Sequence, residues 1–353
     1  MIGNVTEFRL SARMEWSIVL TAVLFVVGLA AAAAWAGKGQ ALTALHALPL
    51  SILPVLLAMS ALNYIMRAGR WLLFSHAMRL PVPAPANALI YVAGFALTTT
   101  PGKVGEALRL WLLKTGYGAR YDRTATLLIA DRLADAVATC FLIALSVSWL
   151  QSYVVVSAIA VIVVGAIAAL CLRPSFLLAG VDTLYAGVGR FPRVFVRIKR
   201  VIRQLEFFAS PRVFGAATVM GLVGWSAEGL SLFVLLHALG IGISPMACIF
   251  IFSFGMIVGA ISVLPGGLGS TEATMIGLLS LQHVPLDTAI VATAVVRVTT
   301  LWFAVGLGLL ALPLALRLVR STRRVFFFEK KNQKTFANLY SSEATIRRND
   351  QCK

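Results

Sequence analysis

Three long and nearly uninterrupted apolar stretches constrain the fold of this chain more than any other feature. They cover residues 16–36, 153–172 and 295–316. An α-helix of about 20 residues crosses the hydrocarbon core of a bilayer and satisfies its backbone hydrogen bonds internally. The chain has 353 residues, 59% hydrophobic and 13% charged, which is more apolar than a soluble domain. We therefore predict an all-α polytopic membrane protein.

The hydropathy pattern predicts about six full transmembrane helices. They are expected at 16–36, about 47–66, 124–149, 153–172, 213–239 and 288–316. Arg9 and Arg13 precede the first apolar run, as in a cleavable signal, but that run is longer than a usual signal core of about 7–15 residues. We therefore expect an uncleaved first helix.

The charge distribution predicts the topology. The chain carries 31 Lys and Arg against 14 acids, a net charge of +17. In a membrane protein such an excess marks cytoplasmic loops rather than nucleic-acid binding. The basic segments are 67–79, 114–123, 173–212 and 317–353. We expect these segments and both termini to be cytoplasmic, and we expect no nucleic-acid partner.

Cysteine and histidine give no sign of a metal site or a cofactor. The four cysteines and four histidines are scattered, without the spacing of metal ligands. We predict that the cysteines in apolar segments are small buried residues. The residues concerned are Cys140, Cys171, Cys248, Cys352, His46, His76, His237 and His283.

Two apolar segments, 86–114 and 246–283, are each broken in the middle by a similar motif. The first reads "PGKVGE" from Pro101 and the second reads "PGGLGSTE" from Pro265. Proline ends a helix, and glycine allows a sharp turn and a close approach of backbone or ligand. The expected topology requires each segment to enter and leave on the same side. We therefore predict two broken or re-entrant helical hairpins, with Pro101, Gly102, Gly105, Pro265, Gly266, Gly267 and Gly269 at their tips.

The two motifs indicate an inverted repeat. The hairpins would enter from opposite sides, as in transporters whose broken helices meet near the midplane and bind substrate there. We predict one membrane domain, 1–316, with repeat halves of about 47–150 and 213–316 joined by the basic segment 173–212. The polar, basic tail 317–353 is expected to be disordered.

Each hairpin carries a glutamate that needs a partner. Glu106 and Glu272 fall in the first helical turn after each break, where an acid can cap the helix. Capping stabilises by about 0.3–1 kcal/mol, whereas an ionised group in a membrane costs about 2.5–3.5 kcal/mol. Arg132 and Arg297 follow the two glutamates at nearly equal spacing and are the expected partners.

Further charges lie within apolar segments. Asp131 and Asp135 share a helix face and form either a functional group or a local ion pair with Arg132. Glu228 is a lone intramembrane acid and a weaker candidate. For Arg67 and Arg70, at the expected end of the second span, we favour snorkelling to the cytoplasmic interface.

The segment 190–208 alternates basic and apolar residues at helical spacing. This pattern is typical of an amphipathic helix on an anionic membrane surface, here the inner leaflet. An ordinary cytoplasmic loop is the alternative.

The motifs "PGKVGEALRLWLL", "ADRLADAVA" and "LPGGLGSTEA", in this order and spacing, resemble the lysylphosphatidylglycerol synthase transmembrane region family of flippase-like proteins. The resemblance covers about 16–316 and implies a bacterial inner-membrane protein that moves or handles lipids. Bifunctional members add a soluble aminoacyltransferase domain, and because only 37 residues follow position 316 here, we expect no transferase chemistry from this chain.

The leading hypothesis is a lipid translocator without a cofactor and without enzymatic activity, in which the hairpins enclose a lipid head group. The expected binding residues are Lys103, Glu106, Arg109, Asp131, Arg132, Glu272 and Arg297. The alternatives are a non-catalytic partner of a lipid-pathway enzyme, such as a hopanoid or glycolipid enzyme, and a membrane enzyme that acts on a lipid phosphate. The sequence does not indicate the oligomeric state.

Overall fold

The computed structural model describes residues 49–100, 104–149, 162, 173–189, 192–205, 210–262 and 264–322. Within these ranges the chain is helical and contains no strand. The predicted spans at 16–36 and 153–172, apart from Ile162, and the tail beyond 322 lie outside the described residues. The number of spans therefore stays a prediction, whereas the all-helical class is confirmed for the described part.

The described part of the chain contains ten α-helices, four short helical segments and a further helical stretch over 303–322. The longer helices are α3 (Leu53–Ala77), α4 (Ala84–Ala93), α5 (Val104–Tyr117), α6 (Tyr121–Trp149), α8 (Pro174–Val188), α9 (Pro192–Gln204), α10 (Pro211–Ala238), α11 (Pro245–Ile261), α12 (Ser270–Leu281) and α13 (Leu286–Arg297). The short segments are η1 (Leu50–Ile52), η2 (Gly94–Leu97), η5 (Pro265–Gly267) and the π-helical turn η6 (Val298–Trp302). Six helices, α3, α4, α8, α9, α10 and α11, have a proline in their first turn, where its missing N–H leaves no hydrogen bond unmade.

Three helical stretches among the described residues are long and apolar enough to cross a membrane. They are Leu50–Ala77, Pro211–Ala238 and Leu286–Thr322. The last of these consists of α13, the π-helical turn η6 and a further helical stretch, so the helix is not interrupted at η6. Together with the apolar composition, these stretches make the chain a multi-pass membrane protein.

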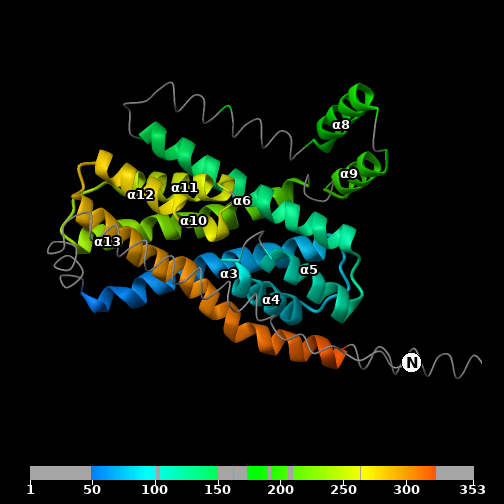
Figure 1. Cartoon of the computed structure of the whole chain (residues 1–353), viewed down its shortest axis with the longest axis horizontal. Helices are drawn as coiled ribbons and strands as arrows, with labels where there is room; N and C mark the ends of the chain where they lie inside the picture. Colours follow the sequence, from blue (N-terminus) through cyan, green and yellow to red (C-terminus); the bar gives the residue numbers. More distant parts are fainter. Residues whose placement is uncertain are drawn as a thin grey trace, which may run out of the picture.

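The helices of the two predicted halves pack directly on each other. α3 contacts α10 along much of its length, α11 lies against α6, α10 and α12, and α12 pairs with α13. The first broken hairpin, α4 and α5, lies beside α3, whereas α8 and α9 lie at the edge of the bundle (Figure 1). The two halves therefore meet along α3 and α10.

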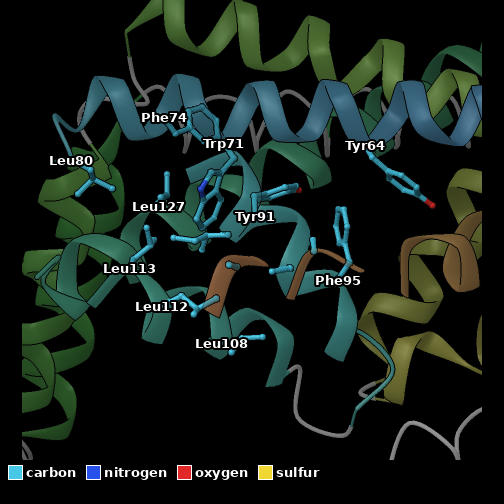
Figure 2. Close-up of a cluster of buried hydrophobic side chains, with 14 of the residues drawn as sticks. Tyr64, Trp71, Phe74, Leu80, Tyr91, Phe95, Leu108, Leu112, Leu113 and Leu127 are labelled. Carbon is cyan, nitrogen blue, oxygen red and sulfur yellow. The ribbon is translucent and has the colours of Figure 1, made fainter. Parts of the chain in front are cut away.

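A buried cluster of large side chains fixes the first hairpin against α3 (Figure 2). The indole Nε1 of Trp71 donates a hydrogen bond to Asn87 Oδ1 at 2.9 Å, and Asn87 Nδ2 donates to Ser75 Oγ at 2.6 Å. The Trp71 and Tyr91 rings lie 5.3 Å apart. Trp71 Nε1 and the Asn87 amide thus have hydrogen-bond partners inside the cluster, whereas the buried Tyr91 hydroxyl has none among the described residues.

Glycines allow close contact between the helices. A Cβ added at Gly229 would lie 2.7 Å from Ile249 Cα, and one at Gly308 would lie 2.1 Å from Ala96 N. Because lipid tails are as apolar as the helices, such close van der Waals contact, rather than exclusion of water, drives association in a membrane.

In both predicted hairpins the α-helix is interrupted around the motif, whereas their re-entrant path through a membrane stays a prediction. In the first, α4 passes into η2 and then α5, with Pro101, Gly102 and Lys103 outside the described residues. In the second, α11 and α12 flank η5. Its three glycines, Gly266, Gly267 and Gly269, have φ values of 61°, 68° and 85°, which only glycine adopts readily.

Three boundaries differ from the prediction. α3 continues past 66 to Ala77, so Arg67 and Arg70 lie inside a helix. Snorkelling was the wrong interpretation, because Arg70 is completely buried and pairs with acids of α6. The last helix runs to 322 and includes the first residues of the predicted tail. In the segment 173–212 the helix predicted at 190–208 is present as α9, and α8 is a second helix that was not predicted.

Candidate functional site

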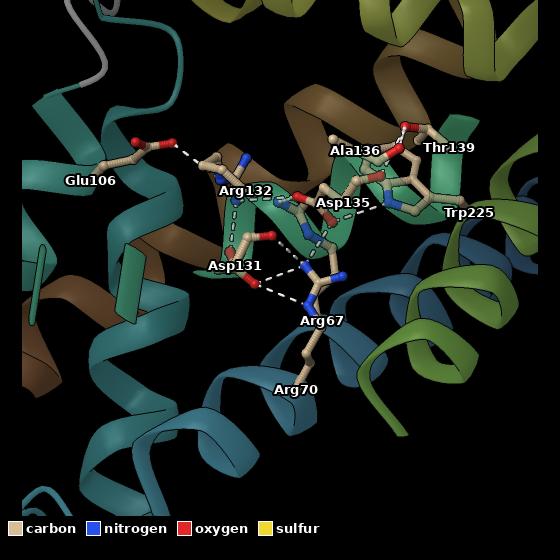
Figure 3. A network of polar contacts seen from close by, with 9 residues as sticks. All are labelled: Arg67, Arg70, Glu106, Asp131, Arg132, Asp135, Ala136, Thr139 and Trp225. Atoms are coloured by element: carbon tan, nitrogen blue, oxygen red, sulfur yellow. Dashed lines mark hydrogen bonds and ion pairs between the residues drawn. The ribbon is translucent and has the colours of Figure 1, made fainter. Parts of the chain in front are cut away.

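A network of buried charges joins α3 to α6. Arg70 Nη2 lies 2.7 Å from Asp131 Oδ1 and 2.6 Å from Asp135 Oδ1, and its Nε donates to Asp131 Oδ1 at 3.1 Å (Figure 3). The side chains of Arg70 and Asp131 are both fully buried. The two aspartates therefore do more than neutralise Arg132 on their own helix: they hold two helices together.

Arg67 extends this network towards α10. Its Nη2 lies 3.3 Å from Asp135 Oδ2, and its guanidinium lies 5.4 Å from the centre of the Trp225 ring. Trp225 Nε1 in turn donates to Asp135 Oδ1 at 3.1 Å. Arg67 is thus fixed by an ion pair and a cation–π contact.

The first predicted glutamate–arginine pair is present but loose. Arg132 Nε lies 3.7 Å from Glu106 Oε1, and 38% of the Arg132 side chain and 25% of the Glu106 side chain are exposed. Arg132 Nη2 lies closer to Asp131 Oδ2, at 2.8 Å. Glu106 is therefore a secondary partner of Arg132.

The second pair is tight and buried. Arg297 Nε donates to Glu272 Oε1 at 2.6 Å, with side-chain exposures of only 2% and 9%. Arg297 Nη2 also donates to the carbonyl oxygen of Gly266 at 2.8 Å, and Gly269 N–H donates to Glu272 Oε2 at 2.6 Å. Glu272 is thus both a helix cap and an ion-pair partner, and the two roles together hold the tip of the second hairpin closed.

Arg109 has a different environment. It is buried, and its Nε donates to the carbonyl oxygen of Tyr91 at 3.0 Å. Its guanidinium lies 4.0 Å from the centre of the Tyr91 ring, 5.2 Å from that of Phe95 and 5.7 Å from that of Trp71. No carboxylate of the described residues is within ion-pair distance of it. Aromatic faces stabilise the cation but do not neutralise it.

These charges surround one cavity between the two hairpins, with a volume of about 190 Å³. The first turn of α5 contributes Gly105 and Glu106, and the second tip contributes Gly266 and Gly267. A Cβ at Gly266 would lie 3.5 Å from Thr99 Cγ2, so the two breaks adjoin each other. The charged residues that line it are Arg67, Glu106, Arg109, Arg132, Glu228 and Arg297.

The π-helical turn closes one wall of the cavity. The Tyr64 hydroxyl on α3 donates to the carbonyl oxygen of Thr300 at 2.6 Å. The Thr299 and Thr300 hydroxyls donate to carbonyl oxygens of the preceding turn, Thr300 to that of Val296 at 2.7 Å. The irregular backbone is thereby satisfied within the protein, as membrane depth requires.

The structure therefore groups most of the predicted site residues. Glu106, Arg109, Arg132 and Arg297 line the cavity, as do three of the tip glycines, and Glu272 supports it from behind Arg297. Asp131 lies behind Arg132 and Arg70 rather than in the cavity wall. Pro101, Gly102 and Lys103 lie outside the described residues.

The sequence interpretation missed the residues contributed by α3 and α10. Tyr64, Arg67 and Trp225 line the cavity, but none was among the predicted binding residues. The available signal was the spacing on α3, because Asn63, Arg67 and Arg70 recur every three or four residues on one helix face. A basic face that also contains asparagine inside an apolar helix points inwards more often than to lipid.

Comparisons with known proteins agree with this architecture. Residues 17–308 match the family described as lysylphosphatidylglycerol synthase TM region. Three matches are to proteins named UPF0104 membrane protein from the archaeon Methanothermobacter thermautotrophicus (strain Delta H). The first is 32% identical over 118 residues, covering 33% of this chain and only 35% of that relative.

The other two matches are longer. One is 22% identical over 322 residues, 83% of this chain and 90% of the relative, and the other is 26% identical over 331 residues, 83% and 94%. The matched family region includes both broken hairpins and the charged helix between them. This chain belongs to the lysylphosphatidylglycerol synthase TM region family.

Proposed function

We propose that this protein translocates a lipid whose head group carries a phosphate, and that the cavity between the two hairpins binds that head group. The observation that carries the proposal is Arg109, a buried guanidinium that lines the cavity without a carboxylate partner among the described residues. An unpaired charge inside a membrane protein is costly. A phosphate oxygen would supply the missing counter-charge and form charge-assisted hydrogen bonds.

The backbone around the cavity supports the same ligand class. The first turns of α5 and α12 border it through Gly105 and Thr271. Free N–H groups and the positive end of the helix dipole favour an anion at such positions. Lys103 lies outside the described residues, and from its place in the sequence motif we expect it to add a further cation to the binding residues.

The other arginines would take part differently. Arg67, Arg132 and Arg297 each have a carboxylate partner already, so their charge is largely neutralised. The loose pair of Arg132 and Glu106 can exchange for a ligand at less cost than the buried pair of Arg297 and Glu272. We therefore assign Arg109 and Arg132 to the phosphate, and Arg297 and Glu272 to the shape of the cavity.

A transport assay tests this function. Purified protein is reconstituted in phosphatidylethanolamine and phosphatidylglycerol vesicles that contain fluorescent phosphatidylglycerol, and dithionite reports the dye on the outer leaflet. We expect translocation to fall at least about tenfold for Arg109→Met, since a lost charge-assisted contact costs about 1.5–3 kcal/mol. Equal rates for Arg109→Met and the wild-type protein would refute the assignment.

A matched control separates the cavity from general damage. Lys114 lies on the same helix as Arg109, three turns of backbone away from the break, and is exposed. Lys114→Met removes one positive charge from α5 outside the cavity and should leave translocation unchanged. Equal loss for both variants would show that charge on α5, rather than the cavity, is what matters.

The basic helix α9 is proposed to lie on the anionic inner leaflet. Val194, Val196 and Ile198 are exposed on it, as are the cations Arg200 and Arg203. Lys199 forms an ion pair with Asp182 of α8. An exposed helix with both apolar and basic side chains fits the interface of an anionic membrane. This placement and the cytoplasmic side of both termini belong to the same proposed topology, in a bacterial inner membrane.

A further inference from the structure

Glu228 of α10 lines the same cavity as Arg109 and is also buried. Among the described residues, no Lys, Arg or His nitrogen lies within ion-pair distance of its carboxylate. The cavity therefore contains one cation and one acid that lack a partner of opposite charge, and these two do not pair with each other. The proposed phosphate head group would neutralise Arg109, but it would not neutralise Glu228.

The cations that face Glu228, and the Tyr64 hydroxyl, are already bound to other groups. From α3, Arg67 is bound to Asp135 and the Tyr64 hydroxyl is bound to the carbonyl oxygen of Thr300, with Asn63 adjacent. From α13, Arg297 is bound to Glu272.

The two remaining helices offer no free cation. From α6, Asp135 adds a like charge, and α11 carries no charged side chain. The only titratable group of α11, Cys248, belongs to an apolar cluster. Each cation near Glu228 thus has another carboxylate as its nearest partner.

An ionised Glu228 opposes the arrival of an anionic head group. Two negative charges in one low-dielectric cavity repel each other strongly. A proton on Glu228 removes the repulsion, and it also removes the cost of the buried carboxylate itself. Binding of an anion and binding of a proton therefore favour each other, and this linkage is reciprocal.

We propose that Glu228 is a proton-binding site, and that the cavity takes up an anionic phosphodiester head group together with one proton. The proposal rests on the proposed function of the cavity.

In the binding step, one O–H bond forms on the Glu228 carboxylate with a proton from water, and the phosphodiester enters with its single negative charge. The net charge of the cavity is unchanged, and release of the head group returns the proton to water. Proton and lipid then move in the same direction.

Binding measurements in detergent test this coupling with the full-length protein. The probe is dihexanoyl phosphatidylglycerol, a short-chain phosphodiester lipid, titrated by calorimetry between about pH 5 and about pH 8. For the wild-type protein we expect affinity to fall as pH rises, by about 5–150-fold over the range. Glu228→Gln mimics the protonated form and should bind tightly at every pH. Calorimetry in two buffers of different ionisation enthalpy should show uptake of about one proton by the wild-type protein near neutral pH and none by the variant.

Asp287→Asn is the matched control. Asp287 is a buried acid in the first turn of α13, outside the cavity, and its substitution should preserve the pH dependence. Thermal unfolding of each variant in detergent establishes that it is folded.

Three results would overturn the proposal, and they differ in what else they affect. A pH dependence retained in Glu228→Gln refutes proton binding at this residue alone. Weaker binding by Glu228→Gln at every pH shows instead that the ionised carboxylate itself contributes to binding, by accepting hydrogen bonds from the glycerol hydroxyls of the head group. Absence of lipid binding by the wild-type protein, or binding that is unaffected by Arg109→Met, refutes the proposed function and this inference together.

Discussion

The two glutamate–arginine pairs predict that the two hairpins differ in stability. Glu272→Gln keeps an oxygen that can accept the Gly269 N–H but removes the charge that faces Arg297. Because Arg297 is only 2% exposed and lies 2.6 Å from the carboxylate, its charge is stranded inside the protein. Removing one partner of such a buried pair costs about 3–5 kcal/mol.

The equivalent change in the first hairpin should cost far less. Glu106 and Arg132 lie 3.7 Å apart, with 25% and 38% of their side chains exposed. Arg132 also keeps its contacts with Asp131 and Asp135. A partly exposed pair contributes about 0–1 kcal/mol, so Glu106→Gln should be nearly neutral for stability.

Reversible unfolding in mixed micelles with rising dodecyl sulfate measures both effects as changes in the free energy of unfolding. The double variant Glu272→Gln/Arg297→Met removes the stranded charge and should recover about 2–3 kcal/mol relative to the sum of the single losses. Strict additivity in this cycle, or equal losses for Glu106→Gln and Glu272→Gln, would refute the reasoning from burial and distance.

Three further outcomes are expected. Arg70→Met leaves two aspartates of α6 without their buried partner, which should lower the free energy of unfolding by about 3–5 kcal/mol. The yield of monodisperse protein in size-exclusion chromatography should therefore fall, and an unchanged yield and melting temperature would contradict the role of the buried network. Gly94→Ala places a Cβ 2.2 Å from Arg109 Nε, so it should displace that side chain and slow lipid translocation more than it lowers the melting temperature. Charge reversal of Arg200 and Arg203 on α9 should weaken the binding of the protein, reconstituted in nanodiscs without detergent, to anionic vesicles by about 1 kcal/mol per residue. The difference between the variant and the wild-type protein should disappear with neutral vesicles or at high salt.

The helix breaks could be predicted from the sequence because their determinants are local. Proline and clustered glycines interrupt an apolar run at Pro265 in the same way in any context, and the interruption can be read without knowledge of the fold. The expected partners of Glu106 and Glu272 followed from spacing that recurs in the two halves. The family resemblance is confirmed by the match over residues 17–308.

Contacts between distant helices could not be predicted in this way. Arg67 and Arg70 look like interfacial cations on a helix end, and only the position of α6 shows that Asp131 and Asp135 face them. Composition also gives no sign that aromatic rings surround Arg109, since Trp71 and Tyr91 come from α3 and α4. The partners predicted for Glu106 and Glu272 could be found from their spacing to a motif. The contacts of Arg70 and Arg109, in contrast, depend on how the helices pack.

The π-helical turn η6 makes the orientation of the last helix sensitive to the number of residues in the turn. A π turn is one residue longer than an α turn, so η6 acts as a single-residue insertion that the helix has absorbed. The stretch beyond Trp302 is rotated by about 100° relative to an uninterrupted helix. Gly308 meets the Ala96 backbone only in this rotated register. Deletion of one residue from 298–302 would therefore rotate the following helix, so that a residue larger than glycine would face the Ala96 backbone. Gly308 would still be present in the chain, but it would no longer lie at the contact.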